Sequence, residues 1–317
     1  MGLTYDPQDL DKMHAERPDA PLMNGESASC QSDRSDTDVS GVIACSQESW
    51  APADARDWDA GAFVWSGFDY RGETGWPNVV SFYGILDLCG FNKGVADWYT
   101  VWWGAAAGWS SSATRVMASP AWAPPSSGTG GSVTITAMAA ASSVQLSVNG
   151  VAVGTRVSMS HLGYAKWTVP FAPGNYSITS YDASGSLVGS FVSTSPGPAT
   201  ALRAVVDWSG SGPNGAIVSG RRDVALVVIS VVDAAGVVVR GSRANVTFTV
   251  TGPGEILGLG NGDHSNHLPG QGLTWVPAYD GLARAIIRGA ATATGAPLRL
   301  TASAAGLVSA EVQVDVV

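Results

Sequence analysis

The chain has 317 residues, of which 45% are hydrophobic and 14% are charged, and its net charge is −9. This length and composition are typical of a globular protein with two or three domains, and they exclude a disordered chain. The acidic balance also excludes a nucleic-acid-binding protein, because phosphate binding needs clustered Lys and Arg.

The sequence contains neither of two targeting features, a membrane-spanning segment and a signal peptide. No window approaches the roughly 18 consecutive apolar residues of a membrane helix. The first residues, MGLTYD, lack the basic and apolar regions of a signal peptide. We therefore expect no membrane partner, and the sequence does not identify the compartment.

Charge and tryptophan are distributed unevenly along the chain. Residues 1–110 hold 17 acidic and 6 basic residues, whereas residues 111–317 hold 9 acidic and 11 basic residues. Eight of the 12 Trp residues also lie before residue 111. Both changes indicate a domain boundary near residue 110.

The first part also holds all three cysteines, at positions 30, 45 and 89. Their number is odd and their spacing matches no zinc or redox motif. We therefore expect packed thiols.

The pattern of residues 1–110 predicts part of an α/β domain. The apolar pair at 22–23 and the continuous apolar run at 61–65 predict strands, the second of them buried on both faces. Residues 49–59 have helical character, with Pro52 suited to a first turn, and residues 94–103 repeat apolar side chains at helical spacing. The expected order is strand, helix, strand, long loop and helix.

The remaining sequence predicts a linker and two all-β units. Residues 111–131 are rich in Ser, Gly and Pro, which predicts a flexible or extended linker. Residues 132–197 and 198–317 then alternate apolar and polar side chains between turns, as β-sandwiches do. The expected strands are 132–138, 144–148, 151–155, 166–169, 176–181, 187–193, 224–232, 244–251, 283–288, 298–303 and 311–317.

Four stretches of residues 1–110 resemble glycoside hydrolase family 2, the β-galactosidase-like family, in their order and spacing. They are GLTY (2–5), PLMNGESAS (21–29), GAFVWSGFDYRGE (61–73) and FYGILDLCGFNK (82–93). The stretches VQLSVNG (144–150), WTVPFAPG (167–174), GLGNGD (258–263) and GLARAIIR (281–288) resemble the domains behind such barrels. The resemblance implies a multi-domain chain: residues 1–110 as the last strands and helices of a (β/α)₈ barrel, followed by two immunoglobulin-like sandwiches.

The resemblance also assigns roles to single residues. Glu26 matches the nucleophile that ends the seventh barrel strand, and Tyr5 matches a tyrosine that hydrogen-bonds it. Trp65 matches an aromatic side chain that packs against the sugar, while Asp69 and Asn92 match loop positions that bind sugar hydroxyls. The alternatives are a surface tyrosine, an ordinary core tryptophan, and polar contacts that only stabilise the loop.

The chain departs from the family pattern in the second carboxyl group. A retaining glycosidase needs an acid/base as well as a nucleophile, about 5–5.5 Å apart. The family's Asn-Glu pair is absent, and neither Glu48 nor Glu73 follows an Asn. The first five barrel strands and the sandwich domains ahead of them are also absent from this sequence. We therefore expect the isolated chain to be inactive.

The resulting hypothesis is the C-terminal portion of a retaining β-glycosidase that acts on β-galactosides, with no cofactor and no metal. The missing N-terminal domains are its expected partners. The two histidines of residues 263–267 lie in a turn-rich loop without a third strong ligand. The alternative is a non-catalytic remnant whose sandwiches bind carbohydrate or protein.

Overall fold

The computed structural model describes residues 2–5, 7–109, 115–124, 131–208, 215–220, 222–292 and 295–317. These residues form two compact units. Unit 1 comprises Met1–Trp76 and Val80–Thr194, and unit 2 comprises Pro77–Val79 and Ser195–Val317. Within the described ranges, no helix is long and apolar enough to cross a membrane.

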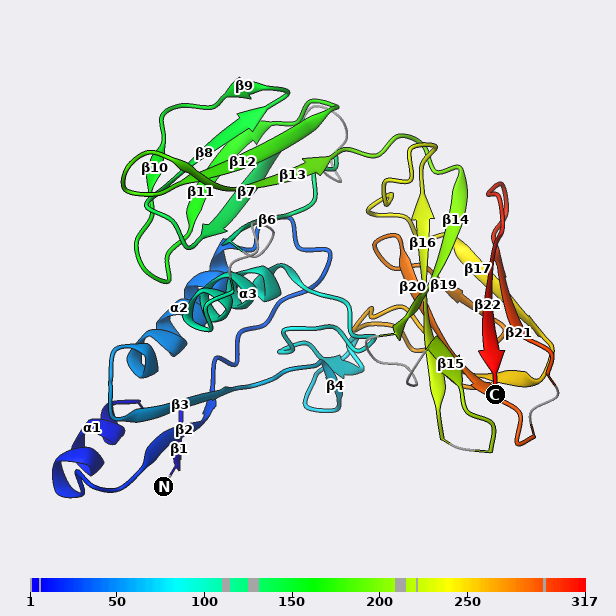
Figure 1. The fold of residues 1–317 in the computed structure, drawn as a ribbon, viewed down its shortest axis with the longest axis horizontal. Helices are drawn as coiled ribbons and strands as arrows, with labels where there is room; N and C mark the ends of the chain where they lie inside the picture. The colour runs from blue at the N-terminus through cyan, green and yellow to red at the C-terminus, as the bar shows by residue number, and fades with distance from the viewer. Residues whose placement is uncertain are drawn as a thin grey trace. The chain divides into compact units, whose positions relative to one another are not determined.

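Unit 1 begins with three parallel strands in the order β1-β2-β3, namely β1 (Gly2–Thr4), β2 (Leu22–Ser27) and β3 (Asp59–Val64). Helix α1 (Pro7–Glu16) connects β1 to β2, and helix α2 (Ser40–Asp54) connects β2 to β3 (Figure 1). Connections through helices are what parallel strands require. The α/β order predicted from the sequence is therefore present.

Two details of that prediction are wrong. Helix α2 begins at Ser40 and ends at Asp54, so it starts nine residues before the predicted segment and ends before β3. Strand β3 is not buried on both faces, because Phe63 is 61% exposed. The apolar run alone could not show which neighbours cover the strand.

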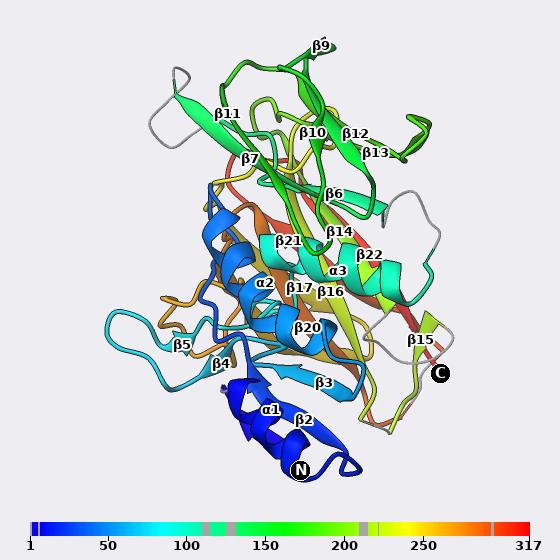
Figure 2. The same cartoon turned by 90° about the vertical axis from the view of Figure 1, so that its left-hand side faces the viewer.

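Helix α3 (Gly94–Ala106) confirms the predicted helical repeat and lies beside α2 in unit 1 (Figure 2). Its buried face includes Val95, Trp98 and Val101, which pack with Ile43 of α2. A loop that contains β4 (Tyr70–Arg71) and β5 (Val80–Ser81) lies between β3 and α3 in the sequence.

An all-β region completes unit 1. Its two antiparallel sheets have the orders β11-β7-β6 and β10-β8-β12-β13, with β9 paired to β8. Their inward side chains, such as Ile135, Leu146 and Ile178, form one core. The strands are β6 (Val116–Ser119), β7 (Ser132–Ala139), β8 (Ser143–Val148), β9 (Val151–Ala152), β10 (Val157–Ser158), β11 (Ala165–Pro170), β12 (Asn175–Tyr181) and β13 (Leu187–Thr194).

Part of the expected linker belongs to this core. Strand β6 pairs with β7 and buries Val116, and Trp122 is fully buried with its indole N–H donating to the carbonyl of Ala172 at 2.9 Å. The Ser-, Gly- and Pro-rich composition of residues 111–131 concealed these few apolar residues. Residues 110–114 and 125–130 lie outside the described ranges.

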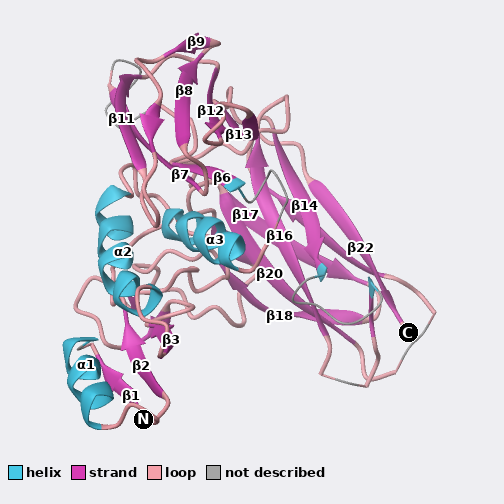
Figure 3. Ribbon diagram, turned by 60° about the vertical axis from the view of Figure 1, so that its left-hand side comes forward, coloured by secondary structure: helices cyan, strands magenta, loops and turns pink. Residues whose placement is uncertain are grey.

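The helices and the first all-β region share a core. Met138 of β7 and Leu162 are buried among the side chains of α2 and α3. The Trp98 indole N–H donates to the carbonyl of Leu162 at 2.9 Å, and the Ser119 hydroxyl donates to Asp97 at 2.9 Å. Helix α3, drawn in cyan in Figure 3, therefore packs in part on β6 and β7, which follow it in the chain.

Unit 2 contains two further sheets around one apolar core, with the strand orders β14-β16-β20-β18 and β15-β22-β21-β17-β19. Ile229, Phe248, Ile287 and Leu300 are among its buried side chains. The strands are β14 (Ala201–Asp207), β15 (Ala216–Ile217), β16 (Val224–Val232), β17 (Asn245–Thr251), β18 (Gly254–Gly260), β19 (Trp275–Pro277), β20 (Leu282–Gly289), β21 (Leu298–Ser303) and β22 (Ala310–Val316).

The cysteine prediction is wrong for two of the three residues. Cys30 and Cys45 form a disulfide with a Cα–Cα distance of 5.9 Å, whereas Cys89 takes no part in a disulfide. The segment after β2 brings Cys30 against α2, and the spacing of the cysteines in the sequence could not reveal that approach.

Candidate active site at the ends of the parallel strands

Three of the predicted site residues lie at the carboxyl-terminal ends of the parallel strands. Tyr5 follows β1, Glu26 is the penultimate residue of β2, and Trp65 follows β3. The Tyr5 amide donates to the carbonyl of Glu26 at 2.9 Å, and the Trp65 amide donates to the carbonyl of Ser27 at 2.7 Å. Parallel pairing therefore places these residues at three adjacent carboxyl-terminal strand ends.

The side chains of Tyr5 and Glu26 interact. Burial raises the pKa of the Tyr5 hydroxyl, a hydrogen bond from Ser29 lowers it, and the hydrogen bond and charge of Glu26 raise it. The Ser29 hydroxyl donates to the Tyr5 hydroxyl oxygen at 2.7 Å. The Glu26 side chain is only partly buried, and its backbone amide donates to the Oδ1 atom of Asn24 at 3.3 Å.

Trp65 is held by the loop that follows it. Its indole N–H donates to the Tyr70 hydroxyl oxygen at 2.9 Å, and the two rings meet edge to face with centroids 5.5 Å apart. The Tyr70 hydroxyl in turn donates to Glu73. The charge of Tyr70 is also a minor cause of the raised pKa of Tyr5.

Asp69 lies inside the loop and is 3% exposed. Its Oδ1 atom accepts hydrogen bonds from the Lys93 ammonium at 2.5 Å and from the Gly84 amide at 2.9 Å. Burial raises the pKa of Asp69 to about 6, against the opposing effect of Lys93. These contacts are those of the alternative reading, in which Asp69 stabilises the loop.

Asn92 is exposed on the same loop, and its backbone bridges to Leu86. Within the described ranges, no hydrogen bond joins the Asn92 side chain to Glu26, Tyr5 or Trp65. Among the other carboxylates, Glu48 is exposed on α2, and Glu73 is the acceptor for Tyr70.

Sequence reasoning missed Ser29, Tyr70 and Lys93. Ser29 and Tyr70 lie within the stretches that carry the family resemblance, three and five residues after Glu26 and Trp65, and their hydroxyl groups were the available signal. Lys93 ends another of these stretches, but its residue type gave no signal, because a lysine is ordinarily a surface residue.

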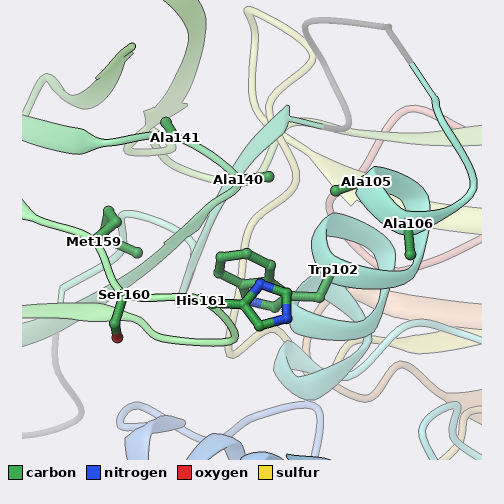
Figure 4. A pocket seen from close by; sticks show the side chains of 8 residues that line it. All are labelled: Trp102, Ala105, Ala106, Ala140, Ala141, Met159, Ser160 and His161. Carbon is green, nitrogen blue, oxygen red and sulfur yellow. The ribbon is translucent and has the colours of Figure 1, made fainter. Parts of the chain in front are cut away.

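A pocket in unit 1 lies away from these strand ends. It has a volume of about 430 Å³ and is formed by α3 and two turns of the all-β region (Figure 4). The residues lining it are Trp102, Ala105, Ala106, Ala140, Ala141, Met159, Ser160 and His161. No carboxylate lines this pocket, so the carboxylate chemistry of the chain is to be sought at the strand ends.

Comparison with known families identifies both all-β regions. Residues 214–313 match the glycoside hydrolase family 2 C-terminal domain 5, and residues 130–189 match a domain of unknown function, DUF4982. The β-galactosidase BoGH2A of Bacteroides ovatus is 30% identical over 213 residues, which are 66% of this chain and 23% of that protein. The chain thus spans about a quarter of the length of this curated relative.

Solved structures share the fold. A glycosyl hydrolase family 2 member from Bacteroides cellulosilyticus aligns with a TM-score of 0.82 at 19% identity, over 100% of this chain and 42% of its own. A β-glycosidase from Bacteroides vulgatus aligns with a TM-score of 0.77 at 18% identity, over 97% of this chain and 43% of its own. A family 2 β-glucuronidase gives a TM-score of 0.74 at 20% identity, over 95% of this chain and 32% of its own.

The matches extend over the strand-end region as well as the all-β regions, since these structural alignments cover nearly the whole chain. The predicted family resemblance is confirmed. The chain belongs to glycoside hydrolase family 2 and corresponds to the C-terminal part of proteins of that family.

Proposed function

We propose that this chain is the C-terminal portion of a retaining β-glycosidase that hydrolyses β-galactosides, with Glu26 as its nucleophile. The observation that carries the proposal is the meeting of Glu26, Tyr5 and Trp65 at three adjacent parallel strand ends. Enzymes built on (β/α)₈ barrels place their catalytic groups at the carboxyl-terminal ends of the barrel strands.

In this proposal the Glu26 carboxylate attacks the anomeric carbon as the glycosidic C–O bond breaks, and the departing oxygen takes a proton from the acid/base of the preceding strands. Water, activated by the same acid/base, then hydrolyses the covalent glycosyl-enzyme. The Tyr5 hydroxyl orients the carboxylate, supported by its own hydrogen bond from Ser29 at 2.7 Å. The indole of Trp65, fixed by Tyr70 at 2.9 Å, offers an apolar face to the C–H groups of the sugar. Asp69 does not contact substrate in this scheme, because it is buried against Lys93.

The three strands are, in this proposal, the last strands of a (β/α)₈ barrel, and the two all-β regions are immunoglobulin-like sandwiches. In the described ranges β1 and β3 each pair on one side only, so both edges of the sheet are open to further strands. Closed barrels leave no such edges. The preceding strands would supply the acid/base carboxyl group, and the chain alone would be inactive.

The β-galactoside assignment rests on the relative from Bacteroides ovatus, whose name is β-galactosidase. A structural neighbour is a β-glucuronidase, so the substrate test includes both sugars. No residue of the described strand-end cluster requires a metal or an organic cofactor for this reaction.

The test is the hydrolysis of aryl β-galactosides and aryl β-glucuronides by two purified proteins. One is this chain, and the other is a longer protein that carries the preceding barrel strands. We expect turnover of the galactoside by the longer protein only. Inactivity of the longer protein on every aryl β-glycoside would overturn the proposal and favour the non-catalytic alternative, in which the sandwiches bind carbohydrate or protein.

A further inference from the structure

Lys93 is a buried lysine whose ammonium group joins two segments of unit 1, the chain after β2 and the loop between β3 and α3. Its side chain is 1% exposed. The Nζ atom donates to the Oδ1 atom of Asp69 at 2.5 Å, to the carbonyl of Ser32 at 2.8 Å and to the carbonyl of Phe82 at 3.2 Å. An ammonium group has three hydrogens to donate, and each has an acceptor here.

These acceptors lie on the segments that leave the candidate site. Ser32 is on the chain that follows Glu26 and the end of β2, and Asp69 is four residues after Trp65. Phe82 belongs to the far side of the same loop, where its carbonyl also accepts the amide of Ser32 at 3.1 Å. The ammonium therefore ties the segment after Glu26 to the loop after Trp65.

A second buried ion pair connects the same two segments. The Arg34 Nε atom lies 3.0 Å from the Oδ2 atom of Asp87, and their side chains are 2% and 1% exposed. Asp87 also accepts the amides of Cys89 and Phe91 through Oδ1, at 2.8 and 3.0 Å. Two buried cations thus link the segment after β2 to the loop.

A contribution to stability alone does not explain the buried pair of Lys93 and Asp69. Burial raises the pKa of Asp69 and lowers that of Lys93, which means that desolvation outweighs the attraction between them. Replacing a buried ion pair by apolar groups is often neutral or stabilising. What the pair supplies is a single geometry, because the ammonium must meet three fixed acceptors at once.

We propose that Lys93 is a positioning residue of the candidate active site, which holds the segment after Glu26 and the loop after Trp65 in one arrangement through Ser32, Asp69 and Phe82. The inference rests on the proposed function, because that function makes these strand ends an active site. The hydrogen bonds by which Lys93 links the two segments belong to this chain whatever its activity. It is therefore tested without any measurement of hydrolysis.

Amide hydrogen exchange of the full chain, followed by mass spectrometry, is the first readout. We expect Lys93→Met to raise the exchange rates of residues 28–36 and 66–92 about tenfold or more, because three buried hydrogen bonds are lost. Exchange in β16 of unit 2 should stay unchanged. Lys12→Met is the matched control, since it removes an exposed ammonium that pairs with Asp9, and it should exchange as the wild type does.

A double variant separates positioning from stability, because Lys93→Met alone leaves a buried carboxyl group without its cation. Lys93→Met/Asp69→Asn removes both charges and keeps an acceptor for the Gly84 amide. We expect its melting temperature to return towards the wild-type value while exchange in residues 28–36 and 66–92 remains fast. If Lys93→Met does not fold, the double variant still tests whether Lys93 positions the two segments.

Fluorine NMR of the fluorotryptophan-labelled chain gives the second readout. The Trp65 resonance is identified as the one missing from Trp65→Phe, and we expect it to shift or broaden in the double variant. Wild-type exchange in both segments with an unmoved Trp65 resonance would overturn the proposal. Equally faster exchange in all of unit 1 would also overturn it, because Lys93 would then contribute only global stability.

Discussion

The backbone amide of Tyr5 donates a hydrogen bond to the carbonyl oxygen of Glu26 at 2.9 Å, and this bond sets the two residues side by side at the ends of β1 and β2. The side chains interact as well, since the Glu26 carboxylate raises the pKa of the Tyr5 hydroxyl. Tyr5 and Glu26 are thus joined both through the backbone and through their side chains.

Tyr5→Phe should impair catalysis more than substrate binding. The change removes the hydroxyl that contacts Glu26, and a hydrogen bond to a charged group contributes about 1.5–3 kcal/mol, or about ten- to a hundredfold in rate. We expect kcat of the longer protein to fall by that factor with KM nearly unchanged, measured with an aryl β-galactoside. Ser29→Ala, which removes the donor to Tyr5, should lie between the wild type and Tyr5→Phe. A Tyr5→Phe protein with wild-type kcat would contradict the assigned role.

The Cys30–Cys45 disulfide should stabilise unit 1. It closes a loop of 15 residues, and a cross-link of that length contributes about 3 kcal/mol in the chain-entropy model. We expect Cys30→Ser/Cys45→Ser to lower the free energy of unfolding by about this amount. Urea denaturation followed by tryptophan fluorescence is suitable, because ten of the 12 Trp residues lie in residues 1–194. Cys89→Ser is the control, and an equal loss there would argue against the disulfide.

Gly84→Ala should disrupt the loop between β3 and α3. A Cβ atom at this position would lie 2.2 Å from the Asp69 amide nitrogen and 2.4 Å from the Leu86 carbonyl oxygen, both of them backbone atoms that cannot rotate away. We expect the melting temperature to fall and the Gly84 amide to lose its bond to Asp69. Gly67→Ala in the same loop has open space around its Cβ atom and should be tolerated. Equal melting temperatures for the two variants would show that the close approach is unimportant.

The ionisation of Asp69 should make stability depend on pH. Its pKa in the folded chain is about 6, above the ordinary value of 3.8, because burial penalises the carboxylate. The folded chain therefore binds this proton more tightly, and the stability that Asp69 contributes is full below its ordinary pKa and declines as the pH rises through about 6. We expect the melting-temperature difference, wild type minus Asp69→Asn, to decrease from pH 4 to pH 7. An increase over that range would contradict the assignment.

Much of the site was predictable because the signal was local. Glu26 and Trp65 sit in stretches whose order and spacing match family 2, and parallel pairing then brings their strand ends together. The strands of unit 2 were predictable for a similar reason, since alternation such as that of residues 224–232 reports directly on burial.

The remaining features depend on contacts between distant segments. Lys93 is buried because Ser32 and Asp69 surround it, although 61 and 24 residues of sequence separate them from it. Trp122 enters a core from a segment whose composition predicts a linker, and Met138 packs against helices that precede it by 32 residues or more. Without α2 and α3, the all-β region that follows them would expose Met138 and Leu162.

The most direct test of the account is to trap the covalent intermediate on Glu26. A slow fluorinated β-galactoside lets the glycosyl-enzyme accumulate, and peptide mass spectrometry then locates the sugar. In the longer protein we predict one added glycosyl group on the peptide that contains Glu26, and none in Glu26→Gln, which should also lose turnover. A glycosyl group on another carboxylate, or undiminished turnover by Glu26→Gln, would contradict the assignment of Glu26 as the nucleophile.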